Sequence, residues 1–172
     1  IAPVLQAGNV RRLVEIGALR GENTRQIIEH LGPETELHVI DPVPAFDPAE
    51  HEREFAGQYV FHRALSVDVL GDLPVMDAAL IDGDHNWFTV YNECRLLAER
   101  SLAEGAPLPI MLLHDVLWPY GRRDLYYSPE TIPEEHRQPY AQKGIHPGRN
   151  ELAKGFSGLN PNHYNATHEG GP

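Results

Sequence analysis

The sequence predicts an α/β fold built around one doubly wound, mostly parallel sheet. Up to about residue 115, short apolar runs rich in β-branched residues alternate with segments of helical period. Such an alternation returns the chain to parallel neighbouring strands by right-handed crossovers. The 172 residues and the hydrophobic content of 41% suit one domain that buries its own core.

The individual elements follow from this alternation. The expected strands are 12–16, 37–40, 59–63, 77–81 and 110–113. The expected helical segments between them are 23–32, 47–57, 67–70 and 87–103. Asn23 or Thr24 is expected to cap the first helix, and Asp47 opens the second with a capping box.

The rest of the chain has a different character. Residues 116–172 show neither a helical nor a strand period, and they are rich in Pro, Gly and aromatic residues. We interpret them as a long lid or binding loop attached to a core at 1–115, because plain disorder is poor in aromatic residues. The chain begins at Ile1 rather than at Met, so we expect it to be a piece of a longer protein.

Charge and composition exclude several classes of function. A formal net charge of -11 argues against binding nucleic acid or an anionic membrane surface. The sequence has no apolar run long enough to cross a bilayer and no signal-peptide pattern. Its single cysteine, Cys94, suits a cytoplasmic protein and is expected to be a core thiol. The sequence is compatible with a homo-oligomer.

Glycine and acidic residues follow the first two expected strands, where open α/β sheets bind their ligands. The first strand runs into Glu15, Gly17 and Gly21, and the glycines allow a tight turn and close approach to a ligand. The spacing is not that of the dinucleotide motif G-x-G-x-x-G, and a carboxylate here suits a cationic ligand. Asp41 follows the second strand and is placed either to accept bonds from two ribose hydroxyls or to form a turn before Pro42.

Two further polar clusters follow the fourth and fifth strands. Because neighbouring strands end at one edge of the sheet, Asp82, His114 and Asp115 are expected to converge. Two carboxylates and an imidazole are enough protein ligands for a divalent cation. The alternative is that they orient a substrate through hydrogen bonds alone. Asp84 or Asn86 is expected to cap the helix that begins near residue 87.

The glycine motif, Asp41 and the sequences IDGDH and LLHDV together resemble the class I S-adenosylmethionine-dependent methyltransferases. The similarity covers residues 10–115, and the nearest branch is that of the small-molecule O-methyltransferases, some of which use a divalent metal. The resemblance implies a Rossmann-like fold and S-adenosylmethionine as the cofactor. The residues that it implies for cofactor binding are Glu15, Gly17, Gly21, Asp41, Ser66 and Asp82. Within this set, Gly17 would line the methionine part, Asp41 the ribose and Ser66 the adenine.

The resemblance also implies a catalytic centre. Asp82, His114 and Asp115 match the metal ligands of the metal-dependent branch, which would hold Mg²⁺ or another divalent cation. His85 stands where that branch often has a catalytic lysine, and imidazole can serve as the general base beside Asp82. His114 departs from the acidic residue expected there. The last two strands of the family, an antiparallel hairpin, are not recognisable before residue 172.

The resemblance leaves the methyl acceptor open. We expect a hydroxyl on a sugar or a glycosylated small molecule, with residues 116–172 as the acceptor lid. A nucleotide-linked oxidoreductase on a similar sheet is the main alternative, and the missing dinucleotide motif counts against it. A non-catalytic cofactor-binding module is the third.

Overall fold

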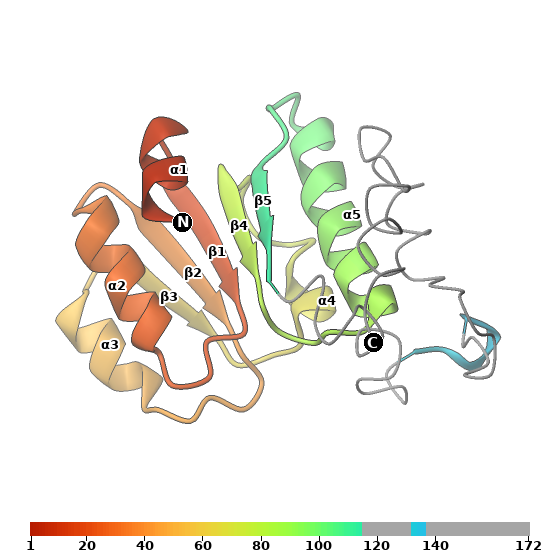
Figure 1. The fold of residues 1–172 in the computed structure, drawn as a ribbon, viewed down its shortest axis with the longest axis horizontal. Coiled ribbons are helices and arrows are strands. Elements are labelled where there is room, and N and C mark those ends of the chain that lie inside the picture. Colours follow the sequence, from red (N-terminus) through yellow and green to blue (C-terminus); the bar gives the residue numbers. More distant parts are fainter. Residues whose placement is uncertain (115–131, 137–172) are drawn as a thin grey trace, which may run out of the picture. The chain divides into compact units, whose positions relative to one another are not determined.

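A computed structural model describes residues 1–114 and 132–136 of the chain (Figure 1). Its strands are β1 (Arg12–Ile16), β2 (Glu36–Ile40), β3 (Tyr59–His62), β4 (Ala78–Ile81) and β5 (Ile110–Leu113). Its helices are α1 (Ala2–Ala7), α2 (Glu22–Leu31), α3 (Pro48–Glu54), α4 (Ser66–Val69), α5 (Trp87–Ala103) and the short 3-10 helix η2 (Glu134–His136). Among the described residues, no helix is long and apolar enough to cross a membrane.

The chain divides into two compact units. Residues 1–83 and 96–114 form the first unit, which holds the whole sheet, α1 to α4 and the second part of α5. Residues 84–95 and 115–172 form the second unit. The division into a core and a lid, expected at residue 115, stays a prediction.

The described sheet has five strands, all parallel, in the order β3-β2-β1-β4-β5. The chain moves outward from β1 to β3 and then returns to the other side of β1 through β4 and β5. Right-handed crossovers in opposite directions put α2 and α3 on one face and α4 with the second part of α5 on the other (Figure 1). The doubly wound sheet predicted from the sequence is confirmed, with its switch point between β1 and β4.

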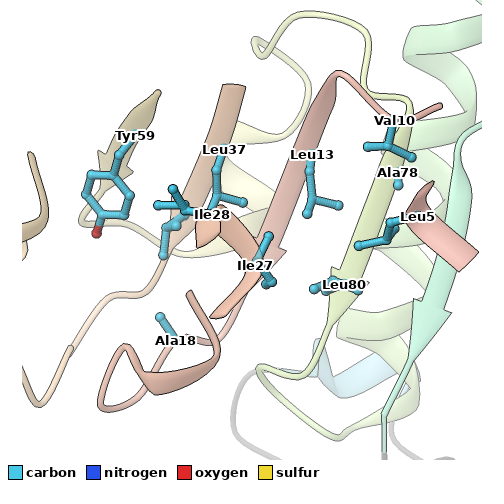
Figure 2. Close-up of a cluster of buried hydrophobic side chains, with 11 residues drawn as sticks. Leu5, Val10, Leu13, Ala18, Ile27, Ile28, Leu37, Tyr59, Ala78 and Leu80 are labelled. Atoms are coloured by element: carbon cyan, nitrogen blue, oxygen red, sulfur yellow. The ribbon is translucent and has the colours of Figure 1, made fainter. Parts of the chain in front are cut away.

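Apolar side chains fill the face of the sheet that carries α1, α2 and α3 (Figure 2). Leu13 and Leu37 are fully buried there, and Ile27 and Ile28 of α2 pack against them. Leu5 of α1 is also 1% exposed, so α1 closes the end of this core. The opposite face is buried too, as both faces of a parallel sheet must be. Its buried residues include Val14, Ile40, Ala79 and Ile81.

The helix cap agrees with the sequence at α3 and differs at α2. The Asp47 carboxylate accepts a bond from Ala49 N at 3.0 Å and opens α3 as expected. The N-cap of α2 is Gly21, so the expectation of Asn23 or Thr24 was wrong. Both side chains instead donate to a buried carboxylate below the helix, which a local capping rule does not anticipate.

Candidate functional site

The loop after β1 passes very close to the loop after β4. Gly17 has a φ of +85°, a left-handed conformation that favours glycine. A Cβ on Gly17 would lie 2.7 Å from the Cα of Gly83 and would also meet the Asp82 carbonyl group. The N–H of Gly17 donates to the carbonyl oxygen of Ile40 at 2.9 Å. Only glycine therefore allows the carboxyl ends of β1, β2 and β4 to meet this closely.

Asp41, the residue after β2, is a buried hydrogen-bond acceptor for two loops. Its Oδ2 accepts from the N–H groups of Ala18 and Leu19 at 3.0 and 2.9 Å. Its Oδ1 accepts from Val43 N at 2.8 Å. The side chain thus joins the loop after β1 to the loop after β2, which are the two loops expected to hold the cofactor.

Glu15 lies on β1 directly below this junction and is 1% exposed. Asn23 Nδ2 donates to its Oε1 at 2.7 Å, and the Thr24 hydroxyl donates to its Oε2. The pKa of Glu15 is raised to about 7, mainly by burial and also by the carboxylates of Asp82 and Asp41, against the lowering effect of the two hydrogen bonds. Three carboxyl groups therefore meet at the carboxyl ends of β1, β2 and β4, and a cationic ligand would relieve their repulsion.

Asp82 and His114 come together as predicted, at the ends of β4 and β5. His114 Nδ1 lies 3.1 Å from Asp82 Oδ1, and both side chains are about half exposed. Octahedral ligands about 2.1 Å from one ion lie about 3.0 Å apart when adjacent, so this pair has the spacing of two neighbouring metal ligands. Asp115 lies outside the described residues, which contain no group of three or more side chains that could hold a metal ion.

The polar residues after β4 divide between structural and candidate catalytic roles. Asn86 caps α5, since its Oδ1 accepts from Thr89 N at 2.9 Å, and this prediction is confirmed. Asp84 accepts from the Thr89 hydroxyl at 2.8 Å and from the side-chain amide of Asn86, so it supports the same cap. His85 lies in the second unit and is partly exposed, and its role as a base stays a prediction. Cys94 is a core thiol as expected, since it is 1% exposed, and this burial raises its pKa to about 12.

Gly21 and Ser66, both expected to bind the cofactor, are also packed against neighbouring residues of the fold. Gly21 has a φ of +71°, and a Cβ there would lie 3.1 Å from His51 Cε1 and 3.3 Å from the Phe46 ring. This glycine is thus required by the packing of α2 against α3. Ser66 is the first residue of α4 and is buried. Its expected contact with adenine stays a prediction.

Three residues around the site, Leu19, Asn23 and Thr24, were not assigned to it from the sequence. Leu19 has a φ of +48° although it is not glycine, and its side chain is 65% exposed. Its carbonyl oxygen accepts from Ala45 N at 2.6 Å, which fixes the unfavourable conformation. Asn23 and Thr24 hold Glu15 from eight and nine positions later in the chain. The sequence shows that spacing, but the two side chains reach Glu15 only because α2 packs onto β1.

No protein-family model matches this chain, and a search of curated proteins finds no match. Solved structures do resemble it. PaMTH1, an S-adenosylhomocysteine-bound methyltransferase of Podospora anserina, has a TM-score of 0.55 at 13% identity over 99% of this chain and 68% of that one. A protein assigned as a caffeoyl-CoA O-methyltransferase from Staphylococcus aureus has a TM-score of 0.50 at 12% identity over 92% of this chain and 69% of that one.

A third similar structure is assigned as an O-methyltransferase from Klebsiella pneumoniae, with 22% identity and a TM-score of 0.46. It matches 58% of this chain, which spans only 47% of that protein. The first two structures and the strand order show that the chain has the fold of the class I S-adenosylmethionine-dependent methyltransferases. The fold expected from the resemblance is confirmed.

Proposed function

We propose that this chain is the cofactor-binding part of an enzyme that transfers a methyl group from S-adenosylmethionine to a hydroxyl of a small molecule. The observation that carries the proposal is the meeting of Glu15, Asp41 and Asp82 around the Gly17 loop. A sulfonium and an ammonium group suit three carboxyl groups, whereas the diphosphate of a dinucleotide does not. The oxidoreductase alternative is disfavoured for the same reason.

The cofactor would lie along the loops after β1, β2 and β3. In this proposal Gly17 lets the methionine part approach the backbone, and Glu15 acts from below through its charge rather than by contact, because it is 1% exposed. Asp41 Oδ1 accepts one N–H bond and keeps a lone pair for a ribose hydroxyl. Ser66 follows β3 and is assigned to the adenine. Asp82 is assigned to the edge of the methionine part.

The second part of the proposal is a divalent cation held by Asp82 and His114, with Asp115 as the third candidate ligand. The 3.1 Å spacing of the first two suits adjacent ligands, and their oxygen and nitrogen atoms suit Mn²⁺, Fe²⁺ or Zn²⁺ as well as Mg²⁺. A bound cation would lower the pKa of the acceptor hydroxyl. In its absence the same two side chains can orient that hydroxyl by hydrogen bonds.

The proposed reaction is a direct displacement. The acceptor hydroxyl attacks the methyl carbon in line, the carbon–sulfur bond breaks, and the hydroxyl proton passes to His85 as the general base. Alignment of the two reactants can contribute roughly 7 to 11 kcal/mol. A positioned base adds about 10² to 10⁴ in rate. We assign the acceptor to the sugars or glycosylated natural products, with residues 116–172 as the lid over it.

Thermal-shift measurements on the full chain test the cofactor. S-adenosylmethionine and S-adenosylhomocysteine should each raise the melting temperature, because ligands that bind only the folded state stabilise it. NAD should have no effect. Stabilisation by NAD alone would favour the oxidoreductase. Binding without methyl transfer to any hydroxyl in a broad acceptor screen would favour the non-catalytic module.

Turnover measurements then test the metal and the base. Exhaustive EDTA treatment should abolish methyl transfer, and added Mg²⁺ or Mn²⁺ should restore it; unaffected turnover would refute the metal. His85→Ala should lower turnover by about 10²-fold or more and leave cofactor affinity unchanged, because the base acts only on the acceptor proton. His30→Ala is the matched control, since His30 is exposed on α2. A His85→Ala enzyme with wild-type turnover would transfer the role to His114.

A further inference from the structure

Three successive N–H groups of the loop after β1 donate to two residues at the end of β2. Gly17 N donates to the carbonyl oxygen of Ile40, and the next two N–H groups, of Ala18 and Leu19, donate to Asp41 Oδ2. Left-handed φ values at Gly17 and Leu19 flank Ala18, with +85° and +48°. Alternating backbone conformations of this kind turn neighbouring N–H groups toward one point and create an anion site, called a nest.

The anion in this nest is the protein's own. Asp41 is 8% exposed, and Oδ2 accepts two bonds, which is the full capacity of one carboxylate oxygen. Its Oδ1 accepts a third bond from Val43 N at 2.8 Å. One lone pair therefore remains for any ligand. The main partners of this carboxylate are backbone groups of its own two loops.

In dinucleotide-binding folds the corresponding loop and the helix that follows it receive a diphosphate. Here a fixed carboxylate occupies the N–H groups that would bind such an anion. An external phosphate would have to displace Asp41, and it would meet the repulsion of Glu15 and Asp82 as well. The two hydrogen bonds from Ala18 N and Leu19 N to Asp41 Oδ2, rather than the mere presence of an acid at position 41, thus bear on which class of ligand the loop accepts.

We infer that Asp41 is a positioning and specificity residue: its carboxylate fills the N–H nest of the loop after β1, fixes the shape of that loop, and keeps phosphate-bearing ligands out of it. The consequence for cofactor affinity rests on the proposed function. The nest itself does not, since it depends only on contacts within the first unit.

Amide hydrogen exchange tests the nest directly. In Asp41→Ala, the amides of Ala18, Leu19 and Val43 should exchange roughly 10- to 100-fold faster, because each loses a bond to a charged acceptor. Sodium acetate should restore their protection, whereas sodium chloride at equal ionic strength should not. Sodium pyrophosphate should protect the same amides in this variant and leave the wild-type protein unchanged. Unchanged exchange in Asp41→Ala, or no specific effect of acetate, would overturn the inference.

Two further variants guard against a general loss of structure. Asp41→Asn keeps an oxygen for Val43 N but turns an NH₂ group toward the other two donors. Only Ala18 and Leu19 should then lose protection, and equal loss at Val43 would contradict the assigned geometry. Asp47→Ala is the matched control, because this aspartate also accepts a backbone N–H but lies at the start of α3. It should leave all three loop amides protected.

A ligand comparison separates positioning from direct contact. Calorimetry would measure S-adenosylhomocysteine and its 2′,3′-dideoxy analogue with the wild-type protein and Asp41→Ala. If Asp41 acts mainly through the loop, the variant weakens both ligands by the same factor. If it acts mainly by binding the ribose, the loss disappears with the dideoxy analogue, and the positioning role is refuted. Absence of wild-type binding would refute the proposed function instead, and the exchange data would still decide the nest.

Discussion

The buried carboxyl group of Glu15 should make the stability of the protein depend on pH near neutrality. Its folded-state pKa of about 7 lies above the ordinary value of 4.5, so folding favours the protonated form. The corresponding stability is present below pH 4.5 and is lost as the pH rises through about 7. For this 1% exposed group the difference amounts to roughly 3 kcal/mol.

Glu15→Gln removes this titration and keeps a hydrogen-bonding side chain of the same shape. Urea unfolding of both proteins at pH 5 and pH 8 should show that the wild type loses more stability on going to pH 8. Glu29→Gln, an exposed substitution on α2, should behave like the wild type. The prediction fails if wild type and Glu15→Gln lose equal stability over this range.

A pair of histidines joins β2 to β3. His38 Nδ1 lies 3.0 Å from His62 Nε2, and Glu36 Oε1 lies 3.0 Å from the other ring nitrogen of His38. Arg12 in turn donates to Glu36 at 2.8 Å. Glu36 thus favours a proton on His38 Nε2, which leaves His38 Nδ1 to accept from His62. If both rings were fully protonated, His38 Nδ1 and His62 Nε2 would both be donors and could not form a hydrogen bond with each other.

Acid should therefore destabilise this pair. Burial, and then the charge of His38, lowers the pKa of His62. A base with a lowered folded-state pKa contributes stability above its ordinary pKa of 6.5, and this stability is lost as the pH falls through the folded-state value. His62→Gln retains a donor without a proton to gain. Because Glu15 contributes equally to both proteins, the stability of His62→Gln at pH 5 relative to pH 7 should be higher than that of the wild type. His30→Gln serves as the exposed control in urea unfolding, and an equal change in His62→Gln and the wild type would exclude this explanation.

For single residues, the sequence predicts position in the fold but not hydrogen-bond partners. Glu15, Asp41 and Asp82 could be placed at the carboxyl ends of their strands, because strand ends follow from hydrophobic pattern. Their hydrogen-bond partners could not be predicted. The Asn23 side chain reads as a helix cap until α2 packs over Glu15, and the carboxylate after β2, expected as a ribose ligand, also accepts from backbone donors of two loops.

At the scale of elements, the approach of the two loops at Gly17 can be tested against a matched glycine. Gly57 has the same φ of +85°, but among the described residues no atom beyond its two chain neighbours lies within 4 Å of the position of its Cβ. Gly57→Ala should therefore cost only the left-handed conformation, about 1–2 kcal/mol. Gly17→Ala should cost about 1–3 kcal/mol more in urea unfolding, because the new methyl group meets backbone atoms after β4. Equal losses would mean that the close approach is not a constraint.

The sequence predicted β1, β5 and α5 with the observed bounds, since each has a clear period or apolar run. It missed α1, whose six residues are too few to show a helical period, although Leu5 completes the core. It also placed the start of α2 too late. The N-cap of α2 is Gly21, which has a left-handed conformation and packs against His51 and Phe46. This is a tertiary feature that a local capping rule cannot predict.

At the scale of the whole molecule, the order of strands was predictable because right-handed crossovers leave few topologies for five alternating units. That order alone brings Asp82 and His114 to adjacent strand ends, where they lie 3.1 Å apart. The predicted lid at 116–172 lies outside the described residues, apart from 132–136. The acceptor of the proposed enzyme could not be identified from the sequence, because no periodic pattern determines how the side chains of a binding loop are placed.

The central claim is that the carboxyl edge of this sheet binds the methyl donor through the Gly17 loop. Titration calorimetry with S-adenosylhomocysteine tests it most directly, on the wild type, Gly17→Ala and Gly57→Ala, each first shown to be folded by circular dichroism. The account predicts that one ligand binds per wild-type chain, that Gly57→Ala binds equally well, and that Gly17→Ala binds at least about tenfold more weakly, a difference of roughly 1.4 kcal/mol. No binding to the wild type, or equal binding to all three proteins, would contradict it.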